Sequence, residues 1–128
     1  MEEVKLPYAT LYYNEPIVYT VFNENVELGF PEVRALIFHS EKLSGYKPYV
    51  AFSDARAENI RVTPQGRKAA AAPGHAPLSR GSALLVNSNV LKTALNLFDD
   101  IGGFHGAFKA FTDRQEAIDW LLKLPLYS

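Results

Sequence analysis

A strand followed at once by a capped helix stands near the end of the sequence, and this unit limits the possible folds most strongly. Residues 108–111 have an apolar strand pattern, and residues 112–122 follow as an amphipathic helix. We expect Thr112 to cap this helix with Gln115 bonding back to it, while Asp113 complements the positive helix end. The buried face is predicted from four residues at helical spacing, namely Ala117, Trp120, Leu121 and Leu124.

Earlier segments alternate between strand and helix patterns. A candidate antiparallel hairpin at residues 11–22 comes first, and apolar runs at residues 49–52 and 83–86 are typical of buried strands. Helix starts are predicted near Pro31, at Thr63-Pro64 and after residues 87–89. Such alternation favours right-handed crossovers. We therefore predict an α/β protein with a mixed, mostly parallel sheet, an N-terminal antiparallel hairpin and about four helices.

Composition narrows the functional classes. A chain of 128 residues with 48% hydrophobic residues suits one compact domain, which we place at residues 1–128. The net charge of -1 gives no broad positive field, so we expect no nucleic-acid partner. Absence of cysteine excludes disulfides and thiolate metal sites, and no basic leader or long apolar run is present. We expect a soluble, cytoplasmic protein without a transmembrane segment.

Several motifs together resemble the SpoIIAA-like, STAS-type fold over residues 8–124. They are the strand end Ser53-Asp54-Ala55-Arg56, the helix start Thr63-x-x-x-Arg67, the strand Ala83-Leu84-Leu85-Val86, and Phe111-Thr112-Asp113 followed by Ala117 and Trp120-Leu121. The resemblance implies a small bacterial interaction or regulatory module without catalytic residues or cofactors. In the anti-sigma-factor antagonists of this group, a serine after the strand-ending aspartate is the phosphorylation switch. Ala55 stands at that position here, so the resemblance supports the fold without the switch.

Polar residues follow the predicted strands at the edge where parallel sheets bind their ligands and partners. We predict a ligand or partner surface there, made by Ser53, Asp54, Arg56, Asn87, Asn89 and Asp113. Ser53 is expected on the opposite face from Asp54, because side chains alternate along a strand. The alternative interpretation is that these residues are helix caps and a solvated ion pair.

No catalytic or metal site is predicted from the histidines. His39 has no carboxylate at the three- or four-residue helical spacing, His75 stands between prolines, and His105 lies in a glycine-rich segment that follows a helix. A carrier or sensor of a small anionic or lipid-like ligand, using Arg56 and Arg67, is the alternative function. The aromatic hairpin predicts either a homodimer surface or core packing against the first helix, through Tyr8, Tyr12, Tyr13, Tyr19 and Phe22.

Overall fold

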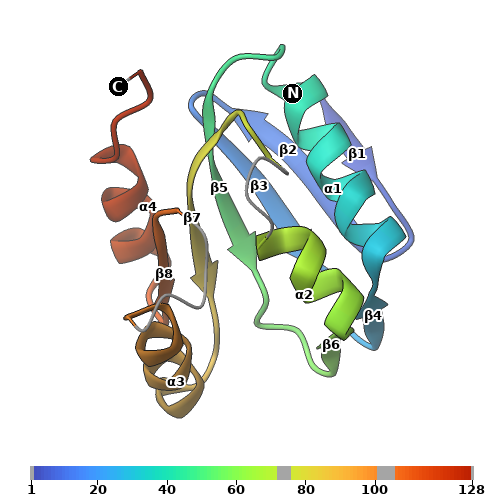
Figure 1. Cartoon of the computed structure of the whole chain (residues 1–128), viewed down its shortest axis with the longest axis vertical. Helices are drawn as coiled ribbons and strands as arrows, with labels where there is room; N and C mark the ends of the chain where they lie inside the picture. The colour runs from blue at the N-terminus through green and yellow to red at the C-terminus, as the bar shows by residue number, and fades with distance from the viewer. Residues whose placement is uncertain (1, 72–75, 101–105, 128) are drawn as a thin grey trace.

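A six-stranded sheet forms the centre of the molecule (Figure 1). The computed structural model describes residues 2–71, 76–100 and 106–127. The strand order is β1-β2-β3-β5-β7-β8; the first three strands pair antiparallel, and β3, β5, β7 and β8 run parallel. This arrangement confirms the predicted mixed sheet. The strand bounds are Glu3–Lys5 (β1), Ala9–Asn14 (β2), Ile17–Phe22 (β3), Tyr49–Asp54 (β5), Ser79–Leu85 (β7) and Phe108–Phe111 (β8).

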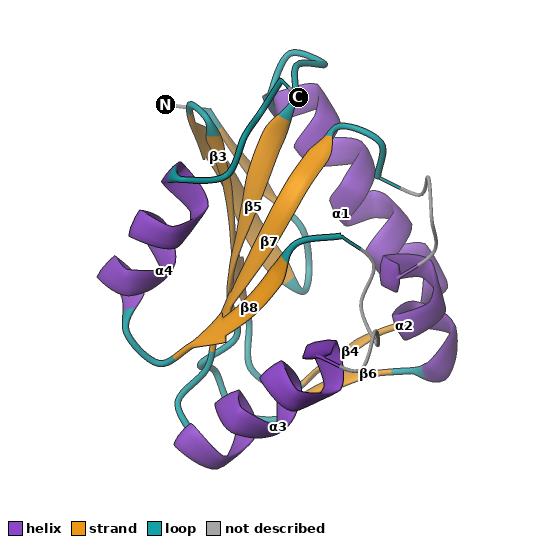
Figure 2. Ribbon diagram, turned by 60° about the vertical axis from the view of Figure 1, so that its left-hand side comes forward, coloured by secondary structure: helices purple, strands orange, loops and turns teal. Residues whose placement is uncertain are grey.

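Helices cover both faces of this sheet. Figure 2 shows α4 on one side of the strands and α1 with α2 on the other. The bounds are Phe30–Leu43 (α1), Pro64–Ala71 (α2), Asn89–Asp100 (α3) and Arg114–Leu122 (α4), so the predicted set of four helices is confirmed for the described residues. His75 and His105 lie outside the described residues.

Two layers of apolar side chains hold the helices to the sheet. On one face, Phe52 and Leu85 pack with Ala117 and Leu121 of α4. Alternate strand residues point to the other face, where a second cluster includes Leu11, Val18, and Leu36 and Leu43 of α1. The predicted buried face of α4 is confirmed, because Ala117 and Leu121 are buried and Trp120 and Leu124 pack against them.

The aromatic hairpin supplies rings to both layers. Tyr8 and Tyr13 join the cluster under α1, where the Tyr8 hydroxyl donates to the Glu32 carbonyl at 3.2 Å. Tyr12 and Tyr19 lie on the other face, with ring centroids 4.7 Å apart and nearly parallel planes. Core packing thus takes up much of the aromatic surface, and the homodimer stays a prediction.

A small two-stranded sheet beside the first was not predicted. It pairs β4 (Val26–Leu28) with β6 (Ile60–Val62) in parallel, and it connects the starts of α1 and α2. Three-residue strands are too short to show a period of two. Gly66 of α2 is buried beside this sheet, with its backbone close to the Leu28 carbonyl.

The edge strand β8 is closed by a side chain of α3. The Asn96 amide nitrogen donates to the Ala110 carbonyl at 3.1 Å, and the Ala110 amide donates to Asn96 Oδ1 at 2.8 Å. These are two of the backbone groups that an added strand would use. The other edge of the sheet, β1, is only three residues long and exposes Glu3 and Lys5.

The start of α4 differs from the predicted capping box. Asp113, not Thr112, is the N-cap: its Oδ1 accepts from the Gln115 amide at 2.8 Å and the Glu116 amide at 3.3 Å. The Gln115 side chain points along the helix instead, and donates to Asp119 at 2.9 Å. The prediction was wrong because the sequence offers two adjacent capping residues, and a carboxylate at this position also complements the helix dipole.

Candidate functional site

Asp54 and Arg56 form a two-point ion pair at the carboxyl end of β5. Arg56 Nε donates to Asp54 Oδ1 at 3.0 Å, and Nη2 donates to Oδ2 at 2.8 Å. The Arg56 amide also donates to Oδ1 at 3.1 Å. The Asp54 side chain is 12% exposed, whereas that of Arg56 is 50% exposed. The alternative interpretation of an ion pair is therefore confirmed for the pair itself, but Asp54, the last residue of β5, is largely buried rather than solvated.

Two opposing effects set the pKa of the Asp54 carboxyl. Burial by itself raises this pKa. Hydrogen bonds from the Arg56 side chain and amide, together with the charges of Arg56 and Arg114, lower it by a larger amount. The net pKa lies below its ordinary value. Ionised Asp54 thus stabilises the fold at neutral pH, and this contribution is lost as the pH falls through the lowered pKa.

We expect Asp54→Asn to lower the free energy of unfolding by about 1–2 kcal/mol at pH 7, since hydrogen bonds to a charged group are lost while half-exposed Arg56 stays hydrated. Below about pH 4, where the carboxyl protonates in the unfolded chain and then in the folded one, the difference should shrink. Urea unfolding at both pH values measures it. Glu24→Gln, at an exposed residue, is the control. If Asp54→Asn lowered the free energy of unfolding equally at both pH values, the lowered pKa of Asp54 would be contradicted.

Asn87 and Arg56 join the ends of β5 and β7. The Asn87 amide nitrogen donates to the Arg56 carbonyl at 3.0 Å. Asn89 begins α3, and its Oδ1 accepts from the Thr112 hydroxyl at 3.4 Å, which links the ends of β7 and β8. Neighbouring strand ends are thus connected in two pairs: predicted Asn87 with predicted Arg56, and predicted Asn89 with Thr112, which was not predicted as a surface residue. The side chain that caps α3 is that of Ser88, whose hydroxyl oxygen accepts from the Leu91 amide at 3.2 Å, rather than that of Asn87 or Asn89.

The remaining two predicted residues have other positions. Ser53 is half-buried on the face opposite to Asp54, as the alternation of strand side chains predicted. Asp113 is exposed and serves α4 as its cap. The candidate site therefore has Asp54, Arg56 and Asn87 at its centre, with Asn89 and Thr112 beside it.

Arg114 belongs to this site and was missed. Its guanidinium carbon lies 5.0 Å from the ring centroid of Phe52 and 5.4 Å from that of Tyr19, and its charge acts on Asp54. The sequence signal was its place in the first turn of α4, where the helix dipole disfavours a cation. Two aromatic faces and a carboxylate offset that cost and hold the guanidinium in place.

His39, for which no catalytic or metal role was predicted, and Arg67, of the alternative ligand-binding function, lie on α1 and α2. His39 is half-buried on α1, with its ring edge against Phe38. Arg67 donates from Nη1 to the Val62 carbonyl at 2.9 Å, so it serves the start of its own helix, α2. Among residues 2–71, 76–100 and 106–127, no three carboxylates or imidazoles gather into a possible metal site.

Immediately after Asn89 in the sequence, α3 exposes a row of apolar side chains. Val90 is 82% exposed, Leu97 is 60% exposed, and Ala94 between them is also exposed. The spacing of four and three residues puts all three on one side of the helix. Leu91 adds a further exposed side chain.

The comparisons with known proteins agree with the fold. A family model described as a domain of unknown function (DUF7793) matches residues 11–125. Among solved structures, an uncharacterized protein of the DUF3478 family from Shewanella loihica PV-4, described as having a SpoIIAA-like fold, matches with a TM-score of 0.56 and 19% identity. The match covers 88% of this chain and 91% of that one. The predicted resemblance is confirmed at the level of the fold. The comparison with curated proteins finds no match.

Proposed function

The chain belongs to the DUF7793 family, and we propose that it is a non-catalytic module that binds a protein partner through the strand-end site and the exposed row on α3. Its fold is shared with a SpoIIAA-like protein. In this proposal Arg56 and Arg114 supply charge, Asn87 and Asn89 supply hydrogen bonds, and α3 supplies apolar area.

The exposed row on α3 is the observation that carries the proposal. Large aliphatic side chains normally turn inward on a helix that packs against a sheet, yet Val90 and Leu97 are both exposed. Grouped exposed apolar residues beside polar ones are typical of protein interaction sites. The row begins one residue after Asn89, so apolar and polar parts adjoin.

A phosphorylation switch has no place in this proposal. Ala55 follows Asp54 and has no hydroxyl group, while Ser53 precedes Asp54 on the other face of the sheet. Asp54 is instead engaged by Arg56 through both carboxylate oxygens. We infer that partner binding here is set by the fixed charges of the site.

Affinity capture from an extract of the source organism, with partners quantified by mass spectrometry, tests the proposal. We expect a partner bound by the unaltered protein to be recovered at least about tenfold less with Asp54→Ala, Arg56→Ala, and likewise with Val90→Asp, Leu97→Asp. All four side chains lie at the proposed surface, so both pairs should affect the same partner.

The matched control is Lys123→Ala, an exposed change after the end of α4 that should leave recovery unaltered. Equal recovery with every variant would remove this surface from the proposal. A thermal-shift screen against small anionic metabolites and acyl lipids separates partner binding from ligand carriage. A ligand at a hundredfold its Kd would stabilise the fold by about 2.7 kcal/mol, and we expect no such response.

A further inference from the structure

Aromatic and basic side chains alternate along the outer side of α1 at intervals of four residues. Arg34, Phe38, Lys42 and Tyr46, which we call the α1 ridge, are all exposed. Four residues of helix advance about 6 Å and turn little more than one full circle, so Arg34, Phe38 and Lys42 lie next to one another. Tyr46 lies just beyond the end of α1. The ridge has no part in the strand-end site.

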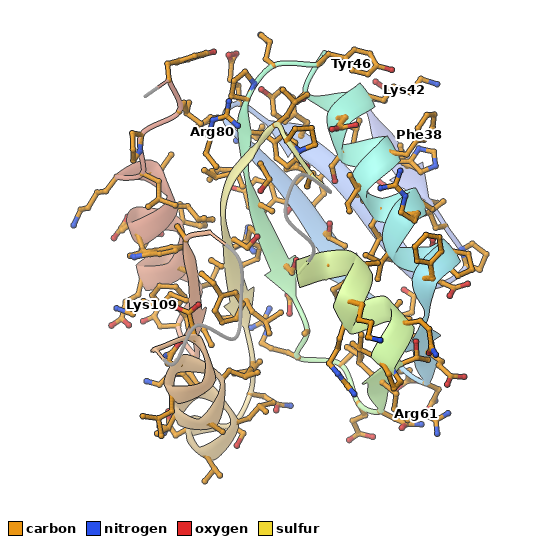
Figure 3. All side chains as sticks on the ribbon, in the orientation of Figure 1. Phe38, Lys42, Tyr46, Arg61, Arg80 and Lys109 are labelled. Atoms are coloured by element: carbon orange, nitrogen blue, oxygen red, sulfur yellow. The ribbon has the colours of Figure 1, made fainter. Side chains whose placement is uncertain are left out.

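The two rings of the α1 ridge are held outward. Phe38 is 54% exposed and Tyr46 is 63% exposed, while the Lys42 ammonium lies 5.9 Å from the Phe38 ring centroid. Figure 3 shows Phe38 and Lys42 following one another along this side of the helix, with Tyr46 beyond its end. Tyr46 has a φ of 61°, a conformation that suits glycine or asparagine better than tyrosine, and its amide donates to the Glu41 carbonyl at 2.9 Å.

The charge of the ridge is positive. Arg34 and Lys42 are its only ionisable groups besides the Tyr46 phenol. The two acids of α1 are differently placed: the Glu32 carboxylate accepts from the Gly29 amide at 2.8 Å, and Glu41 is half-buried. The exposed line of α1 therefore has two cations flanking a ring.

We propose that the α1 ridge docks this domain onto an anionic membrane surface. Aromatic rings favour the headgroup level of a bilayer, and anionic headgroups attract Lys and Arg within a Debye length. The side chains of both cations can extend along apolar surface while their charges stay in water. A bilayer interface offers apolar and anionic contacts together to a convex ridge, without requiring a groove.

The charges of the ridge argue against a second copy as its occupant. Two α1 ridges that crossed antiparallel at Phe38 would place Arg34 of one copy opposite Lys42 of the other, at both ends of a two-fold contact. Like charges in such a contact repel. An acidic peptide or a nucleic acid could pair with the cations, and these two occupants are distinguished by the experiment.

Vesicle flotation at low ionic strength tests the proposal. The full chain is mixed with phosphatidylcholine vesicles that contain either no anionic lipid or about one third phosphatidylserine. We expect binding to the anionic vesicles alone. The double variant Arg34→Glu, Lys42→Glu should lower the partition coefficient for anionic vesicles at least about tenfold. Phe38→Ser should lower it about threefold or more.

The control is Lys109→Glu, a single charge reversal on exposed Lys109 of β8, which Figure 3 shows far from α1; it should bind within about twofold of the unaltered protein. Circular dichroism and urea unfolding confirm that each variant is folded. Failure to bind anionic vesicles, or equal binding by the ridge and control variants, would overturn the proposal. So would preferential binding of polyglutamate or a single-stranded oligonucleotide over the vesicles. The experiment leaves the proposed protein-binding surface untouched.

Discussion

Phe52→Ala should lower the free energy of unfolding by about 3–5 kcal/mol, because the phenyl ring lies fully buried between the sheet and α4. Its ring centroid is 5.4 Å from that of Tyr19, and it supports the guanidinium of Arg114. Removal would leave a cavity and also withdraw one of the two faces that position Arg114. Domains of this size are typically stable by about 5–15 kcal/mol, so the loss is a large fraction. Urea unfolding followed by circular dichroism measures it.

Phe38→Ala is the matched control, with the same chemical change on the exposed side of α1. It loses only surface contacts with Lys42 and His39, so we expect a change below about 1 kcal/mol. Similar losses in the two variants would contradict the placement of Phe52 at the centre of the core.

Gly66→Ala should destabilise the protein by about 1–3 kcal/mol, although alanine is the better helix former. A methyl group at Gly66 would overlap the backbone carbonyl of Leu28 and lie 3.1 Å from Val62 Cγ1. The Leu28 oxygen also accepts from the Thr63 amide at 3.0 Å, so the backbone there is held in place. Thermal and urea unfolding of the purified variant measure the effect.

Gln65→Ala is the neighbouring control, because Gln65 is exposed in the same turn of α2. We expect it to stay within about 0.5 kcal/mol of the unaltered protein. A gain in stability for Gly66→Ala, of the size that propensity alone gives, would mean that α2 does not approach β4 so closely.

The sequence was sufficient for the order of the main elements, because long apolar periods and helix boundaries are local signals. Thr63 illustrates this: its hydroxyl accepts from the Gly66 amide at 3.0 Å, as the Thr-Pro helix start predicted. The short strands β1, β4 and β6 escaped because three residues carry too little pattern. Their pairing depends on neighbours distant in the chain.

The site was predictable in outline but not in its contacts. Parallel topology alone was enough to expect Asp54, Asn87 and Asn89 at one edge of the sheet. The burial of Asp54 and the placement of Arg114 on two aromatic rings depend on how α4 packs across the strands. No local sequence signal reports the distance between a helix and a strand that it covers.

The asparagine that closes β8 limits how this protein recognises others. Because the Ala110 amide and carbonyl are both bonded to Asn96, another polypeptide cannot use them to add a strand to the sheet at β8. At this edge, recognition of another protein must then depend on side chains, which differ between proteins, rather than on the backbone groups that every polypeptide shares. The same pair of hydrogen bonds opposes edge-to-edge pairing of β8 between two copies of the protein.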